Sequence, residues 1–394
     1  MKRFGLFSAL IISAFSLGIV MVVLIQKLST PSASLPLFSQ PDSTTTTILT
    51  PPAPRTVVYG YLPYWNTNKA SFPSSVTHVS YFSLTIQQDG SLLNIPKEKQ
   101  DPGYRKFQQG YLTTLQESLR PGQKIELTLS MMEQEEIPIF IHSPDAQKRL
   151  VQEVLFLQKN YPLSGINVDI EYNGSVTPTL QNDLVTLLSD IRTATKAIDP
   201  NFLLSMAVYG DSGSSHRLTV LELTAPHLDY IVVMTYDYHR RSSPRSGPVS
   251  PLYGKTEGKW EGDIMEDLQL IRQKVPAEKI LLGIPFYGYE WSVEDATNPQ
   301  SFTLPRSGAT ASYERVLQLL EAPGTKVFWD SSALSPYLQY EKNGITQRVY
   351  YDNPLSLSYK LDLVKKAGFG GIAIWALGYE GGSTDLWDVI NSNL

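Results

Sequence analysis

Short strand-like runs alternate with helix-like segments along most of the chain, and this alternation constrains the fold more than any other feature. The predicted strands are residues 57–62, 78–84, 124–129, 165–171, 203–208, 230–236, 280–285 and 371–376. Strands that alternate with helices build parallel sheets, and eight such units make a (β/α)8 barrel. We therefore predict an α/β fold of the TIM-barrel type. A doubly wound open sheet is the alternative, but no glycine-rich phosphate loop follows the first strand.

Helical patterns fill the intervals between these strands. An amphipathic stretch covers residues 101–119, and the predicted helices are residues 179–198, 218–224, 263–274, 356–367 and 385–391. Another helix has a clear start after the third strand, because Ser143 can cap it, Pro144 suits its first position and Asp145 lies in its first turn. These starts support the assignment of helices that cover a central barrel.

The interval 289–350 is too long for an ordinary connection between a helix and a strand. Its own patterns predict a helix at 313–320 and strands at 326–329 and 347–351. We therefore predict a small α+β insertion between the seventh and eighth strands. Such an insertion would form a wall beside the site and deepen it into a groove.

The fourth strand, residues 165–171 with the sequence GINVDIE, carries the candidate chemistry. Apolar residues alternate with Asn167, Asp169 and Glu171, so the amide and both carboxylates point to one face. Residues two apart on a strand lie roughly 7 Å from each other, so one carboxyl pKa should rise. A carboxylic acid that is protonated near neutral pH is what a general acid requires. These residues lie at the carboxyl end of their strand, where TIM barrels place active sites.

An exposed antiparallel strand with a solvated polar face would show the same alternation. The helix-rich flanks of this strand instead favour a parallel sheet, whose strands are buried on both faces. Three polar side chains on the inner face of such a strand cost free energy unless the protein uses them.

The N-terminus has the pattern of a membrane-spanning segment. Lys2 and Arg3 precede an apolar run at 4–25, and Lys27 follows it. A helix of that length reaches roughly 33 Å, which is enough to span a bilayer. We predict an uncleaved anchor over residues 1–27; a signal peptide cleaved near residues 32–34 is the alternative. In both cases the basic N-terminus predicts an extracytoplasmic location for the rest of the chain.

Residues 28–55 are rich in Ser, Thr and Pro, which predicts an extended tether rather than a folded unit. The predicted catalytic barrel therefore covers residues 56–394. Its composition gives no sign of nucleic-acid binding, because the whole chain has a net charge of −5. The chain has no cysteine and five scattered histidines, so we expect neither a metal nor another cofactor. Aromatic residues make up 11% of the chain, which suits the stacking of sugars.

Residues 164–171 resemble the fourth-strand motif D-G-x-D-x-D-x-E of glycoside hydrolase family 18. That family contains chitinases, chitinase-like lectins and bacterial spore-cortex peptidoglycan hydrolases. The last two acidic positions of the motif are kept as Asp169 and Glu171, whereas Ser164 and Asn167 stand at the first two Asp positions. The departure at Asn167 resembles the spore-germination branch, whose motif often reads N-I-D-x-E.

Other motifs of the family follow in the same order along residues 56–394. The sequence MTYD at 234–237 resembles the sixth-strand motif M-x-Y-D, and Trp375 matches the tryptophan of the eighth strand. The sequences YGYEW at 287–291 and YYDN at 350–353 again resemble the spore-germination branch. The resemblance implies a glycosidase that acts on a glycan containing N-acetylglucosamine, with cell-wall glycan favoured over chitin.

The resemblance also implies a substrate-assisted, retaining mechanism. Glu171 would protonate the glycosidic oxygen, and the 2-acetamido group of the substrate would attack the anomeric carbon. Asp169 would accept the acetamido N–H, and Tyr236 would hydrogen-bond the acetamido oxygen with Asp237 beside it. Trp375 would form the floor beneath the sugar at subsite −1.

Four further residues complete the predicted substrate-binding set: Tyr61 and Trp65 after the first strand, Asn167, and Met234. Each has a structural alternative, because aromatic residues also pack barrel cores and Asn167 could serve as an uncharged partner for Asp169. A non-catalytic lectin on the same fold is the alternative function, although lectins of this kind commonly lose the acid that Glu171 represents. A generic barrel with another sugar chemistry is the third reading, and it would not depend on the 2-acetamido group.

Overall fold

The computed structural model describes residues 56–92 and 101–394. The predicted anchor at 1–27 and the predicted tether at 28–55 lie outside these residues. Across the two described ranges, every helix is too short or too polar to cross a bilayer.

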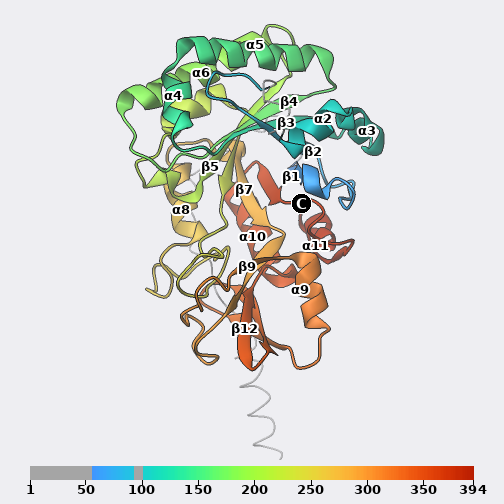
Figure 1. The fold of residues 1–394 in the computed structure, drawn as a ribbon, viewed down its shortest axis with the longest axis vertical. Coiled ribbons are helices and arrows are strands. Elements are labelled where there is room, and N and C mark those ends of the chain that lie inside the picture. Colours follow the sequence, from blue (N-terminus) through green and yellow to red (C-terminus); the bar gives the residue numbers. More distant parts are fainter. Residues whose placement is uncertain (1–55, 93–100) are drawn as a thin grey trace, which may run out of the picture. The chain divides into compact units, whose positions relative to one another are not determined.

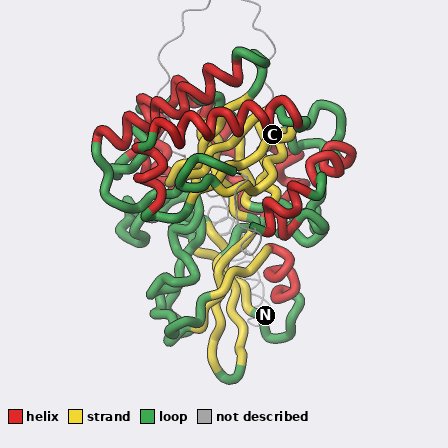
Figure 2. The backbone as a smooth tube through the Cα atoms, turned by 45° about the horizontal axis from the view of Figure 1, so that its top comes forward, coloured by secondary structure: helices red, strands yellow, loops and turns green. Residues whose placement is uncertain are grey.

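A closed barrel of parallel strands forms the centre of the fold, with helices around it (Figure 2). In the described part of the chain, its strands are β1 (Val57–Pro63), β2 (His78–Thr85), β3 (Lys124–Met131), β4 (Gly165–Ile170), β5 (Leu203–Tyr209), β6 (Tyr230–Met234), β7 (Ile280–Pro285) and β13 (Gly371–Trp375). They pair in the order β1-β13-β7-β6-β5-β4-β3-β2, and β2 closes on β1. The predicted TIM barrel is confirmed, and each predicted barrel strand overlaps an observed one.

The register between strands brings the candidate residues to one end of the barrel. Asp169 of β4 lies opposite Ser130 of β3, and Met234 of β6 lies opposite Tyr209 of β5. On the other side of the barrel, Trp375 is the last residue of β13. All these strands run in the same direction, so their final residues meet at the carboxyl end of the barrel.

Helices pack around the barrel, with α5 and α6 side by side at one edge in Figure 1. Their bounds are α2 (Pro102–Gln108), α3 (Tyr111–Ser118), α4 (Glu136–His142), α5 (Pro144–Asn160), α6 (Pro178–Lys196), α7 (Leu221–Thr224), α8 (Ile264–Arg272), α10 (Pro354–Ala367) and α11 (Asp385–Asn393). Helix α5 starts as predicted, because the Ser143 hydroxyl accepts the backbone N–H of Ala146 at 3.3 Å. Its apolar stripe is buried, including Leu150, Val154 and Leu157.

The amphipathic stretch at 101–119 is helical, and the structure divides it into two helices, α2 and α3. Gly110 lies between them with φ 84°, a left-handed conformation that interrupts a helix and that glycine adopts without steric cost. Helix α4 was not predicted; its sequence EIPIFIH is short and carries a proline.

An α+β insertion follows β7, as predicted, and lies beyond one end of the barrel in Figure 1. It contains β8 (Tyr287–Ser292), β9 (Ala309–Ser312), α9 (Tyr313–Leu320), β10 (Lys326–Asp330), β11 (Ser335–Lys342) and β12 (Ile345–Tyr350). The strands form an antiparallel sheet in the order β10-β11-β12-β8-β9. Sequence patterns found α9, β10 and β12 but missed the other three strands. Strand β8 starts only two residues after β7 ends, so the two strands look like one run followed by a loop.

Candidate active site

A cavity of about 700 Å³ opens at the carboxyl end of the barrel. Its walls include seven of the nine predicted site residues: Tyr61, Asp169, Glu171, Met234, Tyr236, Asp237 and Trp375. The insertion supplies part of the wall through Tyr287, Tyr289 and Thr310, as expected.

The other two predicted site residues lie elsewhere. Trp65 is 47% exposed and packs edge-on against Tyr64, outside the cavity lining. Asn167 is fully buried beneath the cavity, so the structure gives it no surface to offer a substrate. Asn167 and Asp169 alternate with apolar residues along β4, as predicted. Asn167 comes earlier in the strand, and the barrel encloses it completely.

Asp169 and Glu171 sit in a poorly solvated environment. Asp169 is 5% exposed, and its Oδ1 has no hydrogen-bond partner among the residues described. Burial raises the pKa of Asp169, and the negative charge of Glu171 raises it further. Burial also raises the pKa of Glu171. Both carboxyl groups are therefore harder to ionise than in water, and a raised carboxyl pKa is what the alternating pattern of β4 predicted.

The orientation of Glu171 is set by its neighbours. Its backbone N–H donates to the Met131 carbonyl at 3.1 Å, which extends the β3–β4 ladder by one residue. The Tyr209 hydroxyl hydrogen-bonds to the Glu171 carboxylate and partly offsets the increase in its pKa. Tyr209 in turn accepts a hydrogen bond from Asn173 Nδ2 at 2.9 Å. The acid is thus held at the end of β4 by groups from the two neighbouring strands, β3 and β5.

Asp237 occupies a strained position at the end of β6. Its φ is 64°, in the left-handed region that Asp and Asn tolerate better than most residues. Two tyrosine hydroxyls from β8 donate to its Oδ1: Tyr289 at 3.0 Å, and Tyr287 in a shorter contact. Burial raises the pKa of Asp237, and these two hydrogen bonds oppose that increase. Strand β8 therefore positions and partly stabilises a carboxylate from the segment that follows β6.

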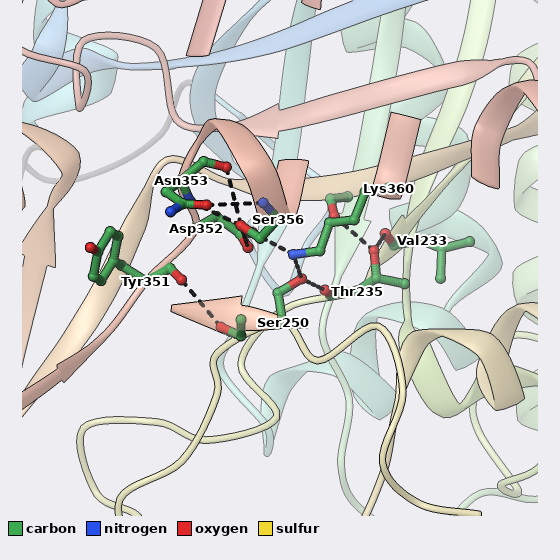
Figure 3. Close-up of polar contacts among 10 residues, drawn as sticks. Val233, Thr235, Ser250, Tyr351, Asp352, Asn353, Ser356 and Lys360 are labelled. Carbon is green, nitrogen blue, oxygen red and sulfur yellow. Dashed lines mark hydrogen bonds and ion pairs between the residues drawn. The ribbon is translucent and has the colours of Figure 1, made fainter. Parts of the chain in front are cut away.

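A buried ion pair supports the backbone next to Tyr236 (Figure 3). Lys360 of α10 pairs with Asp352, and both side chains are at most 3% exposed. Lys360 Nζ also donates to Ser250 Oγ at 2.8 Å, and Ser250 Oγ donates to the carbonyl of Thr235 at 2.6 Å. Because Thr235 directly precedes Tyr236, this chain of contacts fixes the peptide from which Tyr236 extends.

Tyr236 follows β6 and lines the same cavity as the two carboxylates. Burial raises its pKa well above 10, and the charges of Asp169 and Asp237 add to the increase. Its ring meets Tyr287 edge-on at 6.2 Å. The Tyr236 hydroxyl is therefore a neutral donor across the pH range in which carboxyl groups titrate.

Trp375 closes the bottom of the cavity. Its ring packs against Phe82 at 4.7 Å and Tyr61 at 5.6 Å, which limits the directions in which the indole can turn. A half-buried indole fixed in this way offers a flat apolar face to a ligand in the cavity.

A column of buried hydrogen bonds runs below the cavity. Tyr61 donates to Asn167 Oδ1 at 3.2 Å, and Asn167 Nδ2 donates to Ser205 Oγ at 2.9 Å. Ser205 Oγ and the Tyr59 hydroxyl both donate to Glu126 Oε2, at 3.2 and 3.0 Å. Burial raises the pKa of Glu126 to about 7. The amide of Asn167 therefore acts as a neutral link in the column and holds Tyr61 against the cavity.

Sequence reasoning missed three polar residues of the site: Tyr209, Tyr287 and Tyr289. The sequence does contain a signal for Tyr287 and Tyr289. They are two positions apart directly after the seventh strand, so in an extended chain their side chains point to the same face. The partner of those tyrosines, Asp237, lies 50 and 52 residues away, so no local pattern could have revealed the contact. Within residues 56–92 and 101–394, no cluster of three or more His, Asp or Glu side chains is placed to hold a metal ion.

Residues 57–380 match the sequence profile of glycosyl hydrolases family 18. Among curated proteins, a probable endochitinase of Caenorhabditis elegans is 26% identical over 60% of this chain and 40% of its own length. The cortical fragment-lytic enzyme of Bacillus anthracis is 23% identical over 61% of this chain and 52% of its own length. The chain thus spans about half the length of these two relatives.

Solved structures share the fold. The Group IV chitinase of Ostrinia furnacalis, in complex with allosamidin, matches with a TM-score of 0.74 at 21% identity. The match covers 86% of this chain and 98% of that chain. At this level of identity the likeness concerns the fold alone.

Proposed function

Because the chain belongs to glycosyl hydrolases family 18, we propose that it hydrolyses β-1,4 linkages in polymers that contain N-acetylglucosamine. The reaction is retaining and assisted by the substrate's own acetamido group. One observation carries this proposal: Asp169 and Glu171 lie on one face of one strand, with Tyr236 in the same cavity.

That arrangement suits internal attack better than a protein nucleophile. A retaining enzyme with its own nucleophile needs carboxylates that flank the scissile bond, about 5–5.5 Å apart. Adjacent same-face positions on one strand place both carboxylates on the same side of the sugar. The acetamido carbonyl oxygen then attacks the anomeric carbon, while the bond to the leaving oxygen breaks and that oxygen takes the proton of Glu171. Water later opens the oxazolinium ion, and Glu171 recovers a proton from that water.

Asp169 and Tyr236 serve the acetamido group. An ionised Asp169 accepts the acetamido N–H and offsets the positive charge that develops on the ring formed by the attack. Its unpartnered Oδ1 is an acceptor that the protein leaves unsatisfied. Tyr236 donates to the acetamido oxygen and orients it for attack, and Trp375 stacks under the sugar ring.

Two substrates fit this chemistry, chitin and peptidoglycan. The probable endochitinase of C. elegans favours the first and the cortical fragment-lytic enzyme of B. anthracis the second. The Asn167 departure and the YGYEW and YYDN sequences favour peptidoglycan. An extracytoplasmic site of action, with the chain held in the membrane by residues 1–27, suits a cell-wall substrate. Membrane fractionation of the expressed chain tests the location: recovery in the soluble cytoplasmic fraction would contradict it.

The test of activity uses the full chain in detergent, as wild type and as Glu171→Gln. Both proteins are incubated with N-acetylglucosamine oligomers and with purified peptidoglycan, and product masses are recorded. We expect wild type to release fragments that end in reducing N-acetylglucosamine and Glu171→Gln to lose this activity. Glutamine keeps the shape and the Tyr209 contact but carries no transferable proton.

The same experiment distinguishes the alternatives. If neither protein cleaves and both bind the glycan, the chain is a lectin and the role of Glu171 as acid is refuted. If wild type cleaves equally well a substrate in which the 2-acetamido group is replaced by hydroxyl, the substrate-assisted mechanism is refuted.

A further inference from the structure

Arg240 differs from the other cationic residues in the cavity wall. The lining contains Arg217, Lys255 and Arg240. Arg217 forms a two-point contact with Asp211, at 2.9 Å through Nε and 2.6 Å through Nη2. Lys255 pairs with a glutamate of α8. Arg240 pairs with no carboxylate among the residues that the structure describes, so its charge is available to a ligand.

The backbone of Arg240 is fixed on both sides although its side chain is exposed. Its N–H donates to Ser243 Oγ at 2.9 Å, and its carbonyl accepts the indole N–H of Trp291 at 3.2 Å. Its Nε donates to the carbonyl of Asp237 at 3.3 Å. These contacts aim the guanidinium while Nη1 and Nη2 have no hydrogen-bond partner in residues 56–92 and 101–394. Two free, parallel N–H donors match the two oxygens of a carboxylate.

The guanidinium shares the cavity wall with the proposed acid, Glu171. Its positive charge opposes the increase that burial causes in the pKa of both Glu171 and Asp237. A ligand group that reaches Arg240 therefore belongs to a sugar next to the bond being broken.

Two acidic residues of the cavity wall, Asp211 and Asp267, are bound by other side chains. Asp211 is bound by Arg217, and Asp267 accepts the Tyr238 hydroxyl at 2.5 Å while burial raises its pKa to about 6. Glu171 must be protonated to act, which leaves Arg240 with less negative charge beside it at the moment of binding.

We propose that Arg240 binds the carboxylate of an acidic sugar next to the scissile bond, such as the lactyl carboxylate of N-acetylmuramic acid. The inference rests on the proposed function and deepens it, because Arg240 would make the site prefer peptidoglycan strands over neutral chitin. Chitin has no carboxylate at any position, so the free N–H donors of Arg240 add no ion pair to its binding.

The experiment measures binding rather than turnover, in the full-length Glu171→Gln background. The first probe is a peptide-free tetrasaccharide of alternating N-acetylglucosamine and N-acetylmuramic acid. The second is the same sugar with its lactyl carboxylates converted to methylamides, and the third is neutral tetra-N-acetylchitotetraose. We expect the acid to bind about five- to tenfold more tightly than its amide, with a smaller difference at high salt.

Arg240→Gln should remove this preference and leave affinity for the neutral oligomer unchanged. Arg240→Lys keeps the positive charge but lacks the two parallel N–H donors of a guanidinium. It should therefore keep only part of the preference for the acid over its amide. The matched control is Arg241→Gln, an exposed neighbour outside the cavity lining, which should keep all of it.

An equal affinity for acid and amide in the parent, or a preference that persists in Arg240→Gln, would overturn the inference. If the parent binds only the neutral oligomer, the proposed hydrolase stands and the role of Arg240 fails. If it binds no glycan at all, both fail.

Discussion

Removing Lys360 should destabilise the protein strongly, because it leaves a buried carboxylate without its counter-charge. The pair Lys360–Asp352 is almost inaccessible to water, at 1% and 3% exposure. In Lys360→Met, Ser356 is the only side-chain donor left to Asp352 among the residues that the structure describes, and its hydroxyl donates to Oδ1 at 2.8 Å. Breaking one partner of a buried ion pair costs about 3–5 kcal/mol in free energy of unfolding.

The size of the pair's effect on melting temperature follows from the size of the fold. Unfolding entropy of roughly 2.1 cal/mol/K per residue amounts to about 0.7 kcal/mol/K for residues 56–394. A loss of about 3–5 kcal/mol therefore lowers Tm by about 4–7 °C. Calorimetry of the wild-type chain and Lys360→Met measures this shift directly.

A second substitution separates charge from packing. Lys360→Met/Asp352→Asn removes the unpaired carboxylate, so we expect it to regain about half of the lost stability or more. If the double variant is no more stable than Lys360→Met, an uncompensated charge is not the cause and the reasoning is refuted. Both variants lose the hydrogen bond from Lys360 to Ser250, so Ser250 holds the carbonyl of Thr235, next to Tyr236, less firmly. We therefore expect their activity to fall by more than the loss of folded protein accounts for.

Three further predictions concern the carboxylates. Because burial raises the pKa of Glu171, kcat/KM on an N-acetylglucosamine oligomer should fall on an alkaline limb whose pKa lies above the usual 4.5; a limb at or below that value would contradict the assignment. Tyr287→Phe should lower kcat about tenfold with little change in Tm, and Tyr287→Phe/Tyr289→Phe should lower it further, because Asp237 loses its donors one after the other. An unchanged kcat in the double variant would show that these hydrogen bonds do not matter. Glu126 has a folded pKa of about 7 against about 4.5 when unfolded, so the stability that its neutral form contributes is complete below pH 4.5 and lost as pH rises through 7. Relative to wild type, Glu126→Gln should therefore gain about 3 kcal/mol between pH 4 and pH 8 in denaturant titrations; a pH-independent difference would refute this.

The barrel could be predicted because its signals are local. Each strand is a short apolar run and each helix an amphipathic one, and eight alternations leave few other folds. Ser143 capped its helix as expected because a cap needs only residues three positions away. Gly110 divides the amphipathic stretch 101–119 into two helices for an equally local reason, its left-handed φ.

The sequence by itself determined which chemistry the site could carry. Strict alternation put Asp169 and Glu171 on one face of a strand at the end where barrels bind ligands, because side chains of a strand alternate whatever surrounds them. The motif resemblance then named Tyr236, Asp237 and Trp375 as their partners, and the cavity contains all five residues.

Only the tertiary structure decided how deep each side chain lies and which distant groups meet. It buried Asn167 beneath the cavity and left Trp65 outside it, since depth depends on the closure of the whole barrel. It brought the tyrosines of β8 to Asp237, and within the described ranges it left the guanidinium of Arg240 without a carboxylate partner. Such contacts join residues far apart in the chain, and their energies depend on burial, which a linear pattern does not contain.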